Sequence, residues 1–234
     1  GLGDVYKRQG VDHDLMLTVT DLVTAESIAS YAQRQGKTAR IHVKIDTGMG
    51  RYGLLPAEVV PFFDRIATLP RLEVVGLFSH FSVADLADKS YTWQQFTIFE
   101  ETVKALSASG YQIPIRHIAN SAATLDLPAM HLDAVRIGIA MYGLRPNAEI
   151  APPLNLKPAL SLKSHVVRVR TLPAGSSISY GRTYITPREM PVALIPVGYG
   201  DGYHRLLSNR GAVLINGKRA PIVGRVCMDQ FVVD

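Results

Sequence analysis

The segment HVKIDTGMGRYG, residues 42–53, brings side chains that can do chemistry to the end of an apolar run. Asp46 follows the run, Gly48 and Gly50 flank a methionine, and Arg51 comes directly after them. Three interpretations are open: a phosphate-binding loop, a plain turn from strand to helix, or the edge of an active site at a strand end. A P-loop is excluded because no Gly-Lys-Ser/Thr sequence closes the motif.

Polar residues follow further apolar runs in the same way. They are Ser79 with His80, Asn120 with Ser121, and Gly138. In a barrel of parallel strands, the active site lies at the carboxyl ends of the strands. The pattern therefore predicts that these residues and the 42–53 segment share one site.

Apolar runs and amphipathic segments alternate along the first part of the chain. Strands are predicted over residues 15–19, 40–45, 72–81, 115–120 and 134–143, and helices over residues 24–36, 56–69 and 90–109. Thr24 is expected to cap the first helix and Gly36 to end it. The aromatic residues Trp93, Phe96 and Phe99 are expected in the core. Buried strands joined by helices indicate parallel pairing in an α/β fold.

The character of the chain changes after residue 143. Four prolines between residues 144 and 158 indicate a linker. Short strands are then predicted over residues 161–170, 192–197, 212–215 and 221–226, with Asn216 and Gly217 as a hairpin turn. We therefore expect one domain over residues 10–150 and a mainly β domain over residues 156–234.

The two ends of the sequence carry separate expectations. The stretch DVYKRQ, residues 4–9, resembles the translation of an adapter used in sequencing libraries, so residues 1–9 are expected to be an artefact. The last residues, QFVVD, stop inside an apolar run. We therefore expect a protein that is truncated at both ends.

The composition is that of a globular enzyme or binding protein. The chain has 234 residues, of which 47% are hydrophobic, and a formal net charge of +5. No basic face with interleaved aromatic residues is evident, which disfavours nucleic-acid binding. A single cysteine, Cys227, excludes an internal disulfide. No run approaches the ~20 apolar residues of a membrane span, so a cytoplasmic protein without a membrane partner is expected.

Seven motifs occur in a characteristic order: HVKIDTGMGR, GLFSHFSVAD, HIANSAATL, VRIGIAMYGL, SISYGRTY, PVGYGDGYHR and PIVGRVCMDQ. Together they resemble the alanine racemase family, which depends on pyridoxal 5′-phosphate. The resemblance covers residues 11 to 234 and implies the last five strands of a TIM (β/α)8 barrel, followed by a truncated β domain. Alternatives are a broad-specificity amino-acid racemase, a decarboxylase of the same plan, a non-catalytic barrel that binds the cofactor, and an unrelated phosphate-binding barrel.

The resemblance implies an isomerase that interconverts L-alanine and D-alanine and supplies D-alanine for peptidoglycan. Two bases would act on opposite faces of the substrate in a homodimer with composite sites, and no metal is implied. The family's cofactor-binding lysine and a phosphate-binding tyrosine lie outside this sequence. The chain as given is therefore expected to be inactive.

Catalytic roles are implied for three residues. Tyr180 resembles the base that crosses the dimer interface, although it could be an ordinary tyrosine of a β domain. His80 would pack against the cofactor ring. Arg136 would face the pyridine nitrogen, although an interior ion pair with Asp133 or another carboxylate is an alternative. The resemblance assigns the cofactor phosphate to Ser121, Gly138 and Ile139.

Other residues are implied in substrate binding and support. Arg51 would lie beside the substrate carboxylate, with Tyr199 and Met228 entering from the β domain of the partner subunit. Lys44 resembles the family's carbamylated lysine, and a bare lysine on a buried strand would otherwise be costly. Cys227 is expected to be a pocket wall rather than a nucleophile.

Overall fold

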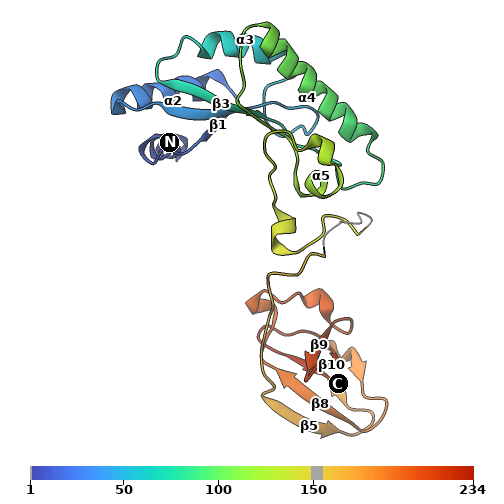
Figure 1. Cartoon of the computed structure of the whole chain (residues 1–234). Helices are drawn as coiled ribbons and strands as arrows, with labels where there is room; N and C mark the ends of the chain where they lie inside the picture. Colours follow the sequence, from blue (N-terminus) through green and yellow to red (C-terminus); the bar gives the residue numbers. More distant parts are fainter. Residues whose placement is uncertain (1, 149–154) are drawn as a thin grey trace. The chain divides into compact units, whose positions relative to one another are not determined.

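The computed structural model describes residues 2–148 and 155–234, in two compact units that divide between Leu160 and Ser161 (Figure 1). Each unit is described by itself. The expected linker is partly outside the described residues, because residues 149–154 are not included. Among the described residues, no helix is both long enough and apolar enough to cross a bilayer.

The first unit is a parallel sheet joined by helices. Its strands are β1 (Leu17–Val19), β2 (Ala39–Lys44), β3 (Leu72–Phe78) and β4 (Ile115–His117), which pair in chain order. Its helices are α1 (Leu2–Asp12), α2 (Leu22–Gln35), α3 (Pro56–Ile66), α4 (Ser90–Ala108) and α5 (Ser121–Asp126). The predicted parallel α/β arrangement is therefore confirmed. The expected artefact, residues 1–9, overlaps α1, and its origin stays a prediction.

Most helix boundaries follow local chemistry. Gly36 ends α2 in the left-handed conformation, with φ of 65°, as predicted. The predicted cap is wrong, since Asp21 begins the helix and accepts a 2.7 Å hydrogen bond from the Thr24 amide. Pro61 lies inside α3, which begins at Pro56, the first residue of the predicted helix. Phe96 and Phe99 are buried, but Trp93 is 46% exposed near the start of α4 and does not belong to the core.

Alternation along β2 divides the sheet into two faces. Ile41, Val43 and Ile45 are buried in the core that α2, α3 and α4 cover, as Figure 1 shows for α3 and α4. His42 and Lys44 therefore lie on the opposite face. This second face carries the candidate site.

The predicted fifth strand over residues 134–143 is wrong. Only one backbone bond joins this segment to the β4 region, from the Arg136 amide to Ala119 O, and one more precedes it, from the Asp133 amide to Arg116 O. They are too few for a ladder, and the chain then enters the 3-10 turn η2 (Ile139–Tyr142). No further described strand pairs with this segment, so the first unit has four described strands rather than five.

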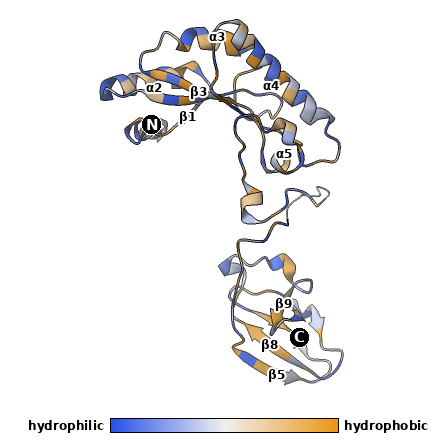
Figure 2. Cartoon of the chain, viewed as in Figure 1, coloured by the Kyte–Doolittle hydropathy of each residue, from blue (hydrophilic) through white to orange (hydrophobic). Residues whose placement is uncertain are grey.

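The second unit is mainly β, as predicted. A three-stranded antiparallel sheet has the order β11 (Phe231–Val233), β8 (Met190–Ile195), β5 (Arg168–Leu172), and Figure 2 shows β8 as a largely apolar strand. Two ribbons complete the described strands: β6 (Ser177–Ile178) with β7 (Tyr184–Ile185), and β9 (Ala212–Ile215) with β10 (Lys218–Pro221). Short turns are η3 (Tyr180–Arg182), η4 (Tyr199–Asp201) and η5 (Arg205–Leu207).

The hairpin prediction is confirmed, because Asn216 and Gly217 have φ of 50° and 77° between β9 and β10. Two strand limits are wrong. The predicted strand over residues 161–170 begins only at Arg168, and the one over residues 221–226 is displaced to Lys218–Pro221. Leu160 and Leu162 are 85% and 66% exposed, so their apolar pattern does not mark a buried strand.

Candidate active site

The second face of the first unit's sheet contains a cavity of about 430 Å³. Four of the predicted site residues line it: Lys44, Arg51, His80 and Arg136. The remaining walls are Met16, Thr18, His42, Tyr52, Phe78 and His117. Lys44, Phe78 and His117 are the last residues of β2, β3 and β4, so the cavity lies at the carboxyl ends of the strands.

The loop after β2 presents Arg51 to this cavity. The Asp46 carboxylate accepts hydrogen bonds of 2.8–3.1 Å from the amides of Gly48, Met49 and Gly50. Burial works to raise the pKa of Asp46, but these amides lower it overall. Asp46 is therefore an anchor of the loop rather than a free acid. Gly48 has φ of 125°, and a Cβ there would overlap the Tyr91 hydroxyl.

Arg136 is the centre of a hydrogen-bond network. Its Nη1 lies 2.6 Å from His117 Nδ1, and its Nη2 lies 3.0 Å from His80 Nδ1 and 2.7 Å from the Ser79 carbonyl. A guanidinium can only donate, so both Nδ1 atoms accept and both histidines carry their proton on Nε2. His117 Nε2 then donates to His42 Nδ1 at 3.0 Å.

The histidines of this network are held neutral. Burial, followed by the charge of Arg136, lowers the pKa of His80 and of His117 to about 4. The same two causes lower the pKa of His42. The alternative ion pair of Arg136 with Asp133 is wrong, because Asp133 pairs with Arg116 at 2.7 Å.

Lys44 is a buried amine in a cationic environment. Lys44 is 2% exposed. Its Nζ atom lies 4.8 Å from the ring centroid of Tyr52 and 5.2 Å from the ring centroid of Phe78. Burial, then the charges of Arg136 and Arg51, lower the pKa of Lys44. Among the described residues, none of these three cations has a carboxylate within ion-pair distance. The cavity is therefore suited to an anion.

Ser121, Gly138 and Ile139 come together beside this network. Ser121 Oγ accepts hydrogen bonds from the Gly138 amide at 2.8 Å and from the Ala140 amide at 3.4 Å. The Ser121 hydroxyl donates to no group among the described residues, which leaves its proton for an external acceptor. A Cβ on Gly138 would meet only Ser121 Oγ, at 3.9 Å. The space next to the Gly138 Cα is therefore open. Asn120 caps α5 and has a structural role.

The other predicted residues lie together in the second unit. A cavity of about 690 Å³ is lined by Ser179, Tyr180, Tyr199, Cys227, Met228, Asp229 and Gln230. Tyr180 is 73% exposed. The Met228 carbonyl accepts a 2.7 Å hydrogen bond from the Gly200 amide, whereas the Met228 amide donates to no described group. Cys227 Sγ lies 3.4 Å from Ser179 Oγ, and the cysteine forms part of the cavity wall.

Four residues that line the two cavities are not predicted as site residues from the sequence: His42, Tyr52, His117 and Ser179. The alternation of His42 and Lys44 within one strand is a signal for His42, because it places both on one face. The contact of His42 with His117 depends on the pairing of β2, β3 and β4. Gly76 on β3 is needed there, since a Cβ would overlap His42 Nδ1.

Comparison with known proteins covers both units. The family described as "Alanine racemase, N-terminal domain" matches residues 6–146, and "Alanine racemase, C-terminal domain" matches residues 159–234. A curated alanine racemase of Halothermothrix orenii is 44% identical over 95% of this chain, and one of Clostridium perfringens is 46% identical over 96%. The chain spans 59% and 58% of those two proteins.

Solved structures give the same result. An alanine racemase of Clostridium difficile 630 superposes with a TM-score of 0.90 at 37% identity, covering 98% of this chain and 60% of that one. The alanine racemase of Streptomyces coelicolor A3(2) has a TM-score of 0.91 at 39% identity, covering 97% and 61%.

Proposed function

The chain belongs to the alanine racemase family, and from this membership we propose that the complete protein interconverts L-alanine and D-alanine with pyridoxal 5′-phosphate. The observation that carries the proposal is Arg136 held between two neutral histidines in a cationic cavity at the strand ends. When bound, the cofactor supplies an electron sink for the carbanion at the α-carbon.

The residues present fit this cofactor. Ser121 offers a free hydroxyl proton, and the open space before Gly138 allows an anion to approach the backbone of Gly138 and Ile139. The Nη atoms of Arg136 are engaged, but its Nε–H donates to no group among the described residues. That N–H would serve the pyridine nitrogen. Because an arginine keeps its proton, the ring nitrogen would stay unprotonated, and His80 would lie against the ring.

Substrate binding and proton transfer are assigned to both units. Arg51 would bind near the substrate carboxylate, and Tyr199 and the Met228 amide would approach the substrate from the β domain. Tyr180 would be one base, with its exposed phenol reaching the cavity of a partner subunit. A phenol that acts as a base must first lose its proton, and the cations Arg51 and Arg136 would stabilise the resulting anion. The functional unit would be a homodimer.

Lys44 is proposed to be carbamylated. Its lowered pKa favours the neutral amine, which can attack CO₂, form an N–C bond and release a proton. The carbamate anion would then offset the charges of Arg51 and Arg136. The partial barrel, the cytoplasmic location and the supply of D-alanine for peptidoglycan belong to the same proposal.

The function is tested with the purified full-length protein and added cofactor. L-Alanine is the substrate, and circular dichroism follows the optical signal, which is expected to decay to zero at a 1:1 mixture. Release of CO₂ with loss of alanine would instead indicate a decarboxylase. Equal rates with L-serine and L-lysine would indicate a broad-specificity racemase. No change with any amino acid would refute the proposal.

A further inference from the structure

Ser179 has a backbone conformation that is close to reserved for glycine. Its φ is 63° and its ψ is −175°, between β6 and the turn η3 that begins at Tyr180. A residue with a side chain is rarely held in this region unless its surroundings impose it, and such residues gather at functional sites. Gly181 and Arg182 also have positive φ, of 73° and 51°. Tyr180 is therefore presented on an unusual turn with left-handed residues on both sides.

A short hydrogen bond restrains this conformation. Ser179 Oγ donates to the Arg225 carbonyl at 2.7 Å, and Cys227 Sγ lies 3.4 Å from Ser179 Oγ. In the loop after β10, Gly224 has φ of 84°, and a Cβ there would lie 2.9 Å from Ser179 Cβ. The neighbouring backbone thus approaches Ser179 closely on the side of its hydroxyl.

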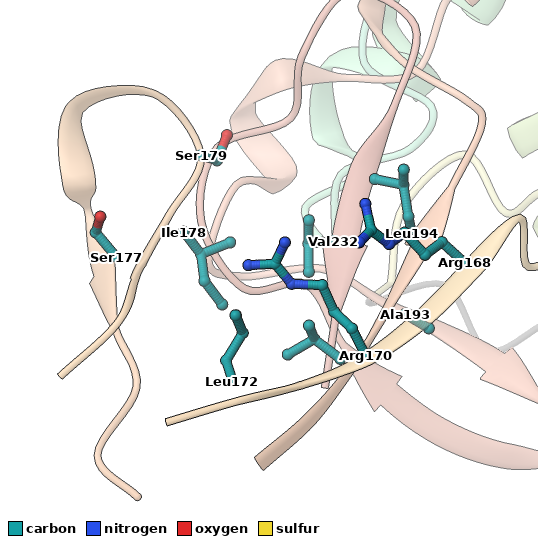
Figure 3. A pocket seen from close by; sticks show the side chains of 10 residues that line it. Arg168, Arg170, Leu172, Ser177, Ile178, Ser179, Ala193, Leu194 and Val232 are labelled. Atoms are coloured by element: carbon teal, nitrogen blue, oxygen red, sulfur yellow. The ribbon is translucent and has the colours of Figure 1, made fainter. Parts of the chain in front are cut away.

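Packing on the other sides of Ser179 is weak, because it lines two cavities. One is the cavity of about 690 Å³ that contains Tyr180. The second has a volume of about 190 Å³, and Arg168, Arg170, Leu172 and Ile178 are among its walls. Figure 3 shows Ser179 at the rim of this second cavity, with its hydroxyl directed away from the two guanidinium groups. Side-chain contacts alone therefore do not hold the residue, and the bond to Arg225 does.

We propose that Ser179 is a positioning residue, whose hydroxyl locks the turn that aims the Tyr180 phenol. The role rests on the proposed function, in which Tyr180 is a base. Proton transfer requires the phenol to lie within about 0.5 Å of its productive place, and a displacement of 1 Å can lower the rate about 100-fold. The bond from Ser179 to Arg225 is the contact that fixes this geometry within the β domain.

Two substitutions separate the hydroxyl from the backbone conformation in the full-length protein. Ser179→Ala removes the hydroxyl and retains a Cβ that disfavours the required φ and ψ. Ser179→Gly also removes the hydroxyl, but glycine adopts this conformation without steric cost. Ser177→Ala is the matched control, since Ser177 is exposed two residues earlier and lines only the smaller cavity.

We expect Ser179→Ala to lower kcat by about 30-fold, or about 2 kcal/mol at 1.36 kcal/mol per tenfold. Ser179→Gly is expected to lower kcat by about fivefold or less, because glycine restores the accessible backbone. KM for alanine and the absorbance of bound cofactor should stay within about twofold of wild type in each variant. The reason is that the displaced group, the Tyr180 phenol, is assigned to proton transfer and not to binding of alanine or the cofactor. The α-deuterium isotope effect on kcat should rise for one alanine enantiomer only, because only one base is displaced.

The outcomes are distinguishable. A wild-type protein that racemises no amino acid overturns the function and the role of Ser179 with it. A racemising wild type in which Ser179→Ala equals Ser177→Ala overturns the positioning role alone. If Ser179→Ala does not fold, the glycine variant decides: an isotope effect unchanged for both enantiomers contradicts the proposal.

Discussion

Arg136 Nη1 lies 2.6 Å from His117 Nδ1, and this contact sets the proton positions of a chain of side chains that continues to His42. The guanidinium has no acceptor, so each imidazole in turn accepts on Nδ1 and holds its proton on Nε2. The arrangement keeps one cation fixed at the strand ends, and no carboxylate of the described residues lies within ion-pair distance of it. A carboxylate there would weaken the site for an anionic cofactor.

His117→Leu is expected to destabilise the protein. The leucine would leave a buried Arg136 N–H without its acceptor, which costs about 1–3 kcal/mol. Urea unfolding measures the change, and His13→Leu is the control because His13 is exposed. His117→Gln, which can still accept a hydrogen bond, should recover part of the loss. Equal stability of the leucine variant and wild type would contradict the network.

Acid is expected to destabilise the protein between pH 6.5 and about 4. The pKa values of His80 and His117 are lowered from 6.5 to about 4, so the unfolded chain binds more protons in this window. Stability rises with pH wherever the unfolded state binds more protons. The contribution of these neutral histidines is therefore fully present above pH 6.5, and it is lost as the pH falls towards 4.

The measurement is the urea midpoint across this pH range for wild type and for His80→Gln/His117→Gln. The double variant should show a shallower fall, because glutamine does not titrate. Carboxylates act in both proteins alike, so the difference between the two slopes isolates the histidines. Parallel slopes would show that the two histidines are not held neutral.

The fold shows which features a sequence can predict. The apolar runs 40–45 and 72–78 can be identified as strands from the sequence. One face of each strand packs in the core and the other face lines the cavity. The segment 134–143 has a similar apolar pattern but forms no ladder, since a strand depends on a neighbour as well as on its own residues. Trp93 follows the helical spacing of Phe96 and Phe99, yet it is exposed in the first turn of its helix.

The candidate site was predictable where chemistry follows a strand directly. Lys44, Arg51, His80 and Arg136 meet in one cavity, as the strand-end pattern indicates. His117 and His42 were missed because their contact depends on strand register and on the missing side chain of Gly76. Ser179 was missed because nothing in its residue type reports a positive φ.

Bicarbonate is expected to raise the thermal midpoint of the wild-type protein at fixed pH and ionic strength. Carbamylation of Lys44 would replace an amine among cations by an anion, which removes repulsion from Arg51 and Arg136. Lys44→Met should show no such rise, and Lys104→Met, on the exposed side of α4, should respond as wild type does. Intact mass spectrometry under CO₂ would show the adduct. A midpoint independent of bicarbonate would count against carbamylation.

Ser121→Ala is expected to weaken cofactor binding about tenfold, the effect of one lost hydrogen bond of about 1.4 kcal/mol. The variant removes both the free hydroxyl proton and the acceptor of the Gly138 amide. Titration of the cofactor-free protein with pyridoxal phosphate, followed by absorbance, gives Kd. Ser107→Ala, at an exposed position of α4, should leave Kd unchanged. An unchanged Kd for Ser121→Ala would exclude Ser121 from the phosphate site.

The central claim is that a residue from each of two subunits completes one site, and mixed dimers test it most directly. Arg51→Ala and Tyr180→Phe, each inactive in the full-length protein, are unfolded together, refolded and assayed for alanine racemisation. If Tyr180 acts in the partner's cavity, a mixed dimer has one site with both defects and one intact site. Activity should then return to about one quarter of wild type at equal mixing. No recovery, with mixed dimers verified by mass, would contradict the account.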